Sequence, residues 1–216
     1  LLSTSAAFAG DSEPLKAILK AKTYAEAQDL IKANLDQLAN DAEKAKAYNK
    51  LVDLAMEKVS KEQGTITSNQ MAKQFGQGKE VPYDTLGFNK AIYDAISNAF
   101  LCNEYDQKPN EKGKVKPKYE SNNASRLYGL RPNLINAGQT AAQHNNQTEA
   151  LKFFGMYVES AKNPLFNSVD KGKSPDTYLG EVARVAGVYA FQANNMELAN
   201  KYVDVALQDT AVYKDA

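Results

Sequence analysis

The sequence has one cysteine, one histidine and no tryptophan among its 216 residues. Cys102 cannot form a disulfide within the chain, so the fold must depend on its hydrophobic core. The apolar residues before it, Ala99, Phe100 and Leu101, favour a buried, inert thiol over a nucleophile. One histidine and one cysteine are too few nitrogen and sulfur ligands for a zinc site. We therefore expect no metal site and no cofactor.

The sequence also lacks an excess charge and, after residue 9, a long apolar run. Its 26 lysines and arginines match its 26 aspartates and glutamates. A balanced chain has no net field to attract nucleic acid, so we expect no nucleic-acid partner. We expect no integral membrane segment, because no later apolar run approaches the roughly 18 residues that span a bilayer. With 43% hydrophobic and 24% charged residues, the composition is that of a globular protein with one or two cores.

The first ten residues, LLSTSAAFAG, are apolar and small, and Ala7-Phe8-Ala9 resembles the small-x-small site that precedes signal-peptide cleavage. We predict that residues 1–9 are the remnant of a bacterial signal peptide and that the protein is periplasmic or secreted. The residue after the predicted cleavage site is Gly10 and not cysteine, which argues against a lipid anchor. The alternative is a cytosolic chain with an apolar N-terminal tail.

Apolar residues recur at steps of three and four, which places them on one face of a helix. The pattern predicts helices over residues 13–21, 24–38, 42–62 and 87–104. The last of these has a continuous apolar face, formed by Phe88, Ala91, Ile92, Ala95, Ile96, Ala99 and Phe100. No segment shows the sustained alternation of apolar and polar residues that is typical of a strand. We therefore predict an all-α protein.

Two segments of the sequence repeat each other at an offset of 49 residues, the separation of Gly138 and Gly187. Residues 135–154 read INAGQTAAQHNNQTEALKFF, and residues 185–203 read VAGVYAFQANNMELANKYV. The offset aligns identical residues: Ala137 with Ala186, Gly138 with Gly187, Ala141 with Ala190, Gln143 with Gln192, Asn145 with Asn194, Asn146 with Asn195, Ala150 with Ala199 and Lys152 with Lys201. We interpret each copy as two helices joined by a tight turn at the paired asparagines, because asparagine tolerates left-handed backbone angles and caps helices well.

Helix starts in the sequence carry capping boxes, in which a polar side chain is followed three residues later by glutamate. The pairs are Thr23 with Glu26, Asn146 with Glu149, and Asn194 with Glu197. The single histidine, His144, directly precedes the first asparagine pair. A histidine at the negative end of a helix dipole is a common structural choice, so we expect no catalytic role for it.

Small residues in each copy lie where two helices must approach closely. The first copy has Leu134-x2-Ala137-Gly138-x2-Ala141 followed by Ala150-x3-Phe154, and the second has Ala183-x2-Ala186-Gly187-x2-Ala190 followed by Ala199-x3-Val203. This arrangement resembles the tetratricopeptide repeat (TPR), W-x2-L-G-x2-Y and then A-x3-F. Residues 24–27 with Ile31 resemble part of a more degenerate copy. The resemblance implies a TPR-like α-α superhelix of antiparallel helical hairpins.

The sequence departs from the TPR pattern at several positions. Leu134 and Ala183 replace the tryptophan, and Ala141 and Ala190 replace the tyrosine. The closing proline is out of register, and the offset of 49 residues exceeds the usual 34. The resemblance covers residues 132–162 and 181–210.

Three segments interrupt the helical pattern. Residues 63–86 hold three glycines and a proline, and residues 164–180 form a connector that accounts for the long spacing of the two copies. Residues 106–118 hold two prolines and five lysines, at Lys108, Lys112, Lys114, Lys116 and Lys118. We interpret this segment as an exposed, solvated loop, with a basic docking strip for an acidic partner as the alternative.

These interruptions divide the chain into four parts. They are the signal-peptide remnant at residues 1–9, degenerate TPR-like hairpins at 10–105, the basic connector at 106–118, and two TPR-like hairpins at 119–216. The final residues, DTAVYKDA, contain no polar closing helix of the kind that solenoids need. We therefore expect further repeats after residue 216.

No motif in the sequence carries catalytic chemistry. Gly172-Lys173-Ser174 resembles the end of a phosphate-binding loop, but Asn167 takes the place of the leading glycine and no strand is expected before it. Acidic pairs are plentiful, as in any helical protein, and nothing singles one out for acid and base catalysis. We therefore expect a protein that is not an enzyme.

The TPR resemblance implies a concave face, lined by the first helix of each hairpin, that binds a peptide or a protein partner. It places these residues on that face: Ile135, Gln139, Gln143, Arg184, Val188 and Gln192. We expect a non-catalytic scaffold for protein interaction. The alternative is an exported module that binds a glycan or a small solute, with some of the 12 tyrosines as stacking platforms. The absence of tryptophan weakens that alternative.

Overall fold

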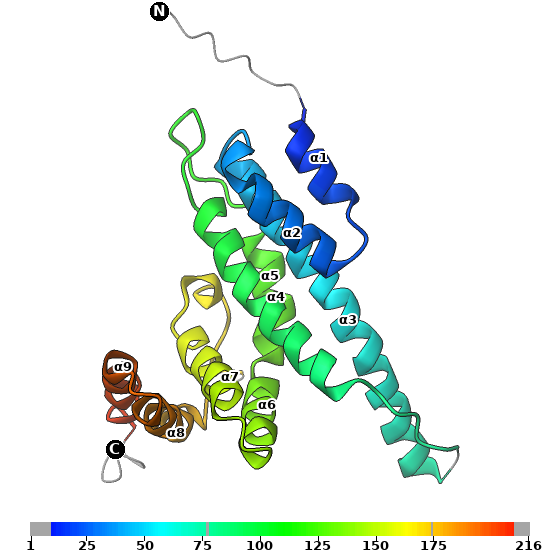
Figure 1. Cartoon of the computed structure of the whole chain (residues 1–216), viewed down its shortest axis with the longest axis vertical. Helices are drawn as coiled ribbons and strands as arrows, with labels where there is room; N and C mark the ends of the chain where they lie inside the picture. Colours follow the sequence, from blue (N-terminus) through cyan, green and yellow to red (C-terminus); the bar gives the residue numbers. More distant parts are fainter. Residues whose placement is uncertain (1–9, 77, 174, 210–216) are drawn as a thin grey trace, which may run out of the picture.

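The computed structural model describes residues 10–76, 78–173 and 175–209. Within these ranges the chain forms nine α-helices and three short 3-10 helices, and it contains no strand (Figure 1). The prediction of an all-α protein is therefore confirmed. The predicted signal-peptide remnant, residues 1–9, lies outside the described residues.

The N-terminal part is built around a long hairpin of α3 and α4 (Figure 1). Its helices are α1 (Glu13–Lys20), α2 (Tyr24–Asn34), α3 (Asp41–Phe75) and α4 (Thr85–Asp106), with a 3-10 turn at Leu35–Gln37. The helix α1 packs on α2 and α3 through Leu15 and Ile18, both fully buried. Asn40 caps α3 by accepting a hydrogen bond from the N–H of Glu43 at 3.0 Å. The predicted helices 13–21, 24–38 and 87–104 match these elements closely.

The helix α3 extends well beyond the end predicted at residue 62. It continues through Gly64 to Phe75, so the prediction of an interruption over residues 63–86 was wrong for its first half. A glycine inside a helix costs only about 1 kcal/mol and does not by itself end the helix. The helix ends at Gly76, where φ of 63° lies in the left-handed region that glycine adopts readily.

The C-terminal part is a succession of shorter helices. They are α5 (Glu120–Leu127), α6 (Pro132–Gln143), α7 (Gln147–Ser160), α8 (Leu179–Gln192) and α9 (Met196–Ala206), with 3-10 turns at Tyr128–Leu130 and Pro164–Phe166. Each of the last four helices packs on the next, so α6, α7, α8 and α9 lie side by side across the lower part of Figure 1. Two helical hairpins, α6–α7 and α8–α9, therefore stack in chain order.

The paired asparagines form the turn of each hairpin. Asn145 and Asn194 adopt φ of 56° and 57°, the positive-φ residues other than glycine in the described part of the chain. The next residue caps the following helix: the side-chain oxygen of Asn146 accepts from the N–H of Glu149, and that of Asn195 accepts from Leu198. The interpretation of each asparagine pair as a tight turn that ends one helix and begins the next is confirmed.

Two of the predicted capping boxes differ in detail. In the second hairpin the cap is Asn195 and not Asn194, because Asn194 takes the left-handed conformation. At α2, Thr23 accepts from the N–H of Glu26 as predicted, but the Glu26 carboxylate accepts from the N–H of Lys22, one residue before the cap. The backbone angles of the turn thus decide which asparagine can cap.

A glycine lets the two helices of each hairpin approach closely. A Cβ atom built on Gly138 would lie 2.5 Å from the ring of Phe154, and one on Gly187 would lie 3.2 Å from Cγ2 of Val203. Phe154 and Val203 are themselves 49 residues apart, so the same contact is made in both hairpins. The small residues of the repeat therefore have the packing role predicted for them.

The connector between the two hairpins is part of the core. Leu165 and Phe166 are fully buried, and the Phe166 ring packs edge-on against Phe100 and Tyr128, with centroids 6.0 and 5.4 Å away. One continuous cluster of buried residues runs from Val52 on α3 to the end of α9. The connector therefore fixes the hairpins on the α3–α4 support in addition to spacing them.

Candidate functional site

A groove of about 540 Å³ lies between α6 and α8, the first helices of the two hairpins. Its lining comes from three consecutive helices: Ile135, Gln139, Ala142 and Gln143 on α6, Phe154 on α7, and Glu181, Val182, Val185 and Tyr189 on α8. A volume of this size is within the usual range for sites that bind ligands. The groove is therefore the candidate functional site.

Aromatic and aliphatic side chains form the buried part of the groove. Phe154 and Val182 are each 5% exposed, and the ring of Tyr189 lies 6.0 Å from that of Phe154 at an angle of 33°. The Phe154 ring can occupy this position because Gly138 beneath it has no side chain. The glycine of the repeat thus shapes the hairpin and the groove together.

Polar side chains lie at the edge of the groove. Gln139 and Gln143 are exposed, and each amide can both donate and accept hydrogen bonds. Glu181 on the opposite side accepts hydrogen bonds from Arg184 at 2.6 and 3.0 Å. These bonds, together with the positive charge of Arg184, lower the pKa of Glu181, which is therefore ionised at neutral pH. The edge offers neutral amides on α6 and one carboxylate on α8.

A buried arginine sets the geometry of the two hairpins. The guanidinium of Arg131, 1% exposed, donates to both carboxylate oxygens of Asp176 at 2.7 and 2.8 Å, to Oγ of Ser160 at 2.6 Å and to the Tyr157 carbonyl at 3.1 Å. It lies between the rings of Tyr128 and Tyr157, at 5.0 and 4.9 Å from their centroids. The start of α6, the end of α7 and the segment that leads into α8 are therefore joined at one point.

The structure divides the residues expected on the concave face into two sets. Ile135, Gln139 and Gln143 on α6 line the groove. Their counterparts at the 49-residue offset, Arg184, Val188 and Gln192, are not among the lining residues, and Arg184 instead pairs with Glu181.

The reason for this division is geometric. A groove between two helices is lined by the flank that each turns toward the other, so α6 and α8 cannot contribute equivalent positions. The residues of α8 that sequence reasoning missed are Glu181, Val182, Val185 and Tyr189. The apolar spacing of Val182, Val185 and Tyr189, at steps of three and four, was a signal that could have identified this flank.

The single cysteine, Cys102, and the single histidine, His144, lie outside the groove. Cys102 is fully buried, and burial, with a smaller effect of the nearby Asp106 carboxylate, raises the pKa of its thiol to about 12. The prediction of a buried thiol is confirmed. His144 is exposed at the end of α6, with Nδ1 2.8 Å from the Thr140 carbonyl oxygen. Among the described residues, no three histidine, cysteine, aspartate or glutamate side chains are grouped as ligands for a metal ion.

No protein-family model, curated protein or solved structure matches the chain. In the part of the chain that the structure describes, no helix has both the length and the apolar composition needed to cross a bilayer. The case for a function therefore depends on the geometry of the groove.

Proposed function

We propose that the groove between α6 and α8 binds an extended peptide segment of a protein partner, and that the chain is a non-catalytic scaffold. The observation that carries the proposal is the composition of the groove: an apolar floor at Phe154 and Val182, edged by the amides of Gln139 and Gln143. Side chains of an extended peptide alternate in direction, so one set can enter an apolar floor while the backbone remains near the edge. Amide side chains complement peptide N–H and C=O groups, because each amide donates and accepts.

We also propose that α6–α9 are two TPR-like repeats of an exported bacterial protein. The stacked hairpins, the matched glycine contacts at Gly138 and Gly187, and the shared asparagine turns support the first part of this proposal. The sequence Ala7-Phe8-Ala9 supports the second.

A peptide accounts for the groove better than a glycan does. Sugar rings bind proteins largely by stacking on exposed aromatic faces. The one tyrosine among the lining residues, Tyr189, is only partly exposed and packs against Phe154. The amides and the apolar floor match a peptide backbone and its side chains instead.

The experiment begins with selection of a displayed library of random ten-residue peptides on the purified chain. The affinity of the strongest binder is then measured by calorimetry for the original chain and for the double variant Gln139→Ala, Gln143→Ala. Each lost hydrogen bond costs roughly 0.5 to 1.5 kcal/mol, so the loss of two should weaken binding by the double variant about 5- to 150-fold.

The chain offers a matched control. Gln192 occupies the position of Gln143 in the second hairpin and is also exposed, but it does not line the groove. Gln192→Ala should therefore change the affinity by less than about twofold, whereas Gln143→Ala alone should weaken it by about 2- to 10-fold. Enrichment of no peptide, or equal effects of the two single variants, would count against the groove. Saturable binding of a panel of neutral oligosaccharides that Gln143→Ala weakens would favour the glycan alternative.

A further inference from the structure

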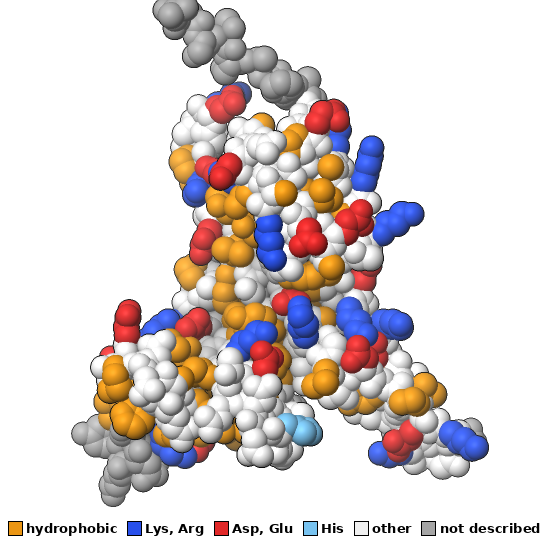
Figure 2. Space-filling model, viewed as in Figure 1, with side chains coloured by type: hydrophobic (Ala, Val, Ile, Leu, Met, Phe, Trp, Pro, Cys, Tyr) orange, Lys and Arg blue, Asp and Glu red, His pale blue; other side chains and the backbone are white. Residues whose placement is uncertain are grey.

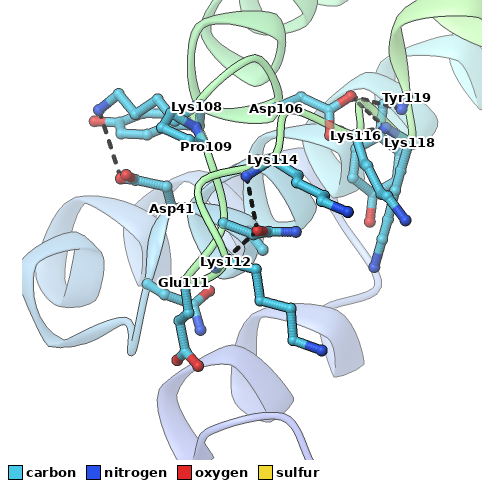
Figure 3. A pocket seen from close by; sticks show the side chains of 14 residues that line it. Asp41, Asp106, Lys108, Pro109, Glu111, Lys112, Lys114, Lys116, Lys118 and Tyr119 are labelled. Carbon is cyan, nitrogen blue, oxygen red and sulfur yellow. Dashed lines mark hydrogen bonds and ion pairs between the residues drawn. The ribbon is translucent and has the colours of Figure 1, made fainter.

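A second cavity, of about 710 Å³, lies at the end of the α3–α4 hairpin where α3 starts and α4 ends. The loop between α4 and α5, residues 107–119, is here called the lysine-rich loop and folds back over these helix ends (Figure 3). The lining of the cavity comes from the start of α3, the end of α4 and the loop between α4 and α5: Asn40, Asp41, Ala42, Tyr105, Asp106, Lys108, Pro109, Asn110, Glu111, Lys112, Lys114, Lys116, Lys118 and Tyr119. It shares no lining residue with the groove between α6 and α8.

The lysine-rich loop is held in a defined shape by its own hydrogen bonds. The buried carboxylate of Asp106 accepts from the backbone N–H groups of Lys118 and Tyr119, at distances of 2.7 to 2.9 Å. The side-chain oxygen of Asn110 accepts from the N–H groups of Lys112 and Lys114 at 3.0 and 3.1 Å. Because the backbone is fixed at both ends, the lysine side chains start from preset positions, which lowers the entropy cost of binding a ligand.

Most of the lysines in the cavity have no partner among the residues that the structure describes. The ammonium of Lys108 is 3.5 Å from the Asp41 carboxylate and 4.4 Å from the centroid of the Tyr105 ring. The other ammonium groups make no hydrogen bond or ion pair with any residue that the structure describes; they belong to Lys112, Lys114, Lys116 and Lys118. In Figure 3 the side chains of Lys112 and Lys114 extend to the side of the loop opposite Lys108 and Asp41.

The acidic residues of the cavity do not neutralise these lysines. The Asp106 carboxylate is occupied by backbone N–H groups and that of Asp41 by Lys108, which leaves Glu111 as the lining carboxylate that bonds to no residue described by the structure. The cavity therefore has an excess of unpaired positive charge within a chain whose formal net charge is zero.

We propose that this cavity binds a compact polyanion, a small molecule with two or more phosphate or carboxylate groups. Its volume lies in the range of small-molecule sites, and several ammonium groups on one preset loop can each contact an anionic oxygen. Charge-assisted hydrogen bonds of this kind are the strong ones. A compact ligand is favoured over an acidic protein segment because all five lysines of the loop line one cavity.

The test is calorimetric titration of the purified chain with pyrophosphate and, separately, with citrate, at low ionic strength. The two arms distinguish phosphate from carboxylate recognition. The variant Lys112→Gln, Lys114→Gln, Lys116→Gln keeps Lys118, whose backbone anchors the loop, and should bind the preferred anion at least about tenfold more weakly. Raising the salt to about 0.5 M should also weaken binding, because exposed charges are screened over a few ångströms at that ionic strength.

A matched variant controls for the general loss of positive charge. Lys20, Lys22 and Lys79 are exposed, lie outside the cavity, and their ammonium groups bond to no described residue. The variant Lys20→Gln, Lys22→Gln, Lys79→Gln should bind within about twofold of the original chain. Equal losses in the two triple variants, or no saturable binding of either anion at about 10 mM, would overturn the proposal. Binding of hexaglutamate but of neither small anion would also overturn it, in favour of an acidic peptide.

Discussion

The two hairpins α6–α7 and α8–α9 share a turn and a glycine contact, but their surroundings differ. The first hairpin packs on α4 on one side and on α8 on the other. The second hairpin packs on α7 and leaves the side chains of Val188, Phe191 and Met196 between 45% and 60% exposed. Figure 2 shows hydrophobic side chains gathered over this second hairpin at the lower left. The comparison teaches that the repeated residues encode the hairpin itself, while its place in the stack decides which surfaces become core and which become groove.

The largest effect should come from the arginine that joins the two hairpins. Arg131→Met would leave Asp176 without its ion pair and remove the hydrogen bond to Ser160, so the free energy of unfolding should fall by about 3 to 5 kcal/mol. Arg184→Met removes a half-exposed pair within α8 and should cost less than about 1 kcal/mol. Urea unfolding followed by circular dichroism measures both. Similar losses would show that Arg131 does not join the hairpins.

The second-largest effect is the difference in stability between alanine variants of the two repeat glycines. In Gly138→Ala the new methyl group would overlap the Phe154 ring, so the variant should lose about 1 to 2 kcal/mol of stability despite the better helix propensity of alanine. In Gly187→Ala the closest atom to the new methyl group is Cγ2 of Val203, 3.2 Å away. The gain in helix propensity and the cost of crowding should nearly cancel, so the free energy of unfolding should change by less than about 1 kcal/mol. Denaturant titration of the pair tests this. A larger loss in Gly187→Ala would reverse the comparison.

The smallest difference is expected at the turns, which are the same in both hairpins. Asn145→Ala and Asn194→Ala each place alanine at a left-handed φ near 57°, which should cost about 1 kcal/mol in either variant. Asn145→Gly and Asn194→Gly should change stability by less than about 0.5 kcal/mol, because glycine adopts this conformation freely. The readout is the thermal midpoint of each variant. Unequal losses in the two alanine variants would show that the turns are not equivalent.

The sequence was sufficient to predict features that depend on neighbouring residues. The asparagine turns follow from local conformation, and the contacts of Gly138 and Gly187 are made with residues 16 positions further along the same hairpin, Phe154 and Val203. The continuation of α3 through Gly64 was missed because the cost of one glycine is small beside the packing of a long helix.

Features that join distant segments could not be predicted in the same way. Burial of Arg131 requires Asp176, which lies 45 residues away, and the insertion of Leu165 and Phe166 into the core has no periodic signal in so short a segment. The α8 side of the groove depends on how that helix is rotated against α6. That rotation is set by packing over the whole stack, so the spacing of Val182, Val185 and Tyr189 shows that they share a flank of α8 but not that this flank faces α6.

The central claim, that the groove between α6 and α8 holds a peptide, is tested most directly by photo-crosslinking at matched positions. A photoreactive p-benzoylphenylalanine is placed at the position of Gln143 in one version of the chain and of Gln192 in another, and each is irradiated with the selected peptide. Because Gln143 lines the groove and Gln192 does not, crosslinking should occur at the first position and be at background at the second. Crosslinking at both positions equally, or at Gln192 alone, would contradict the assignment of the groove.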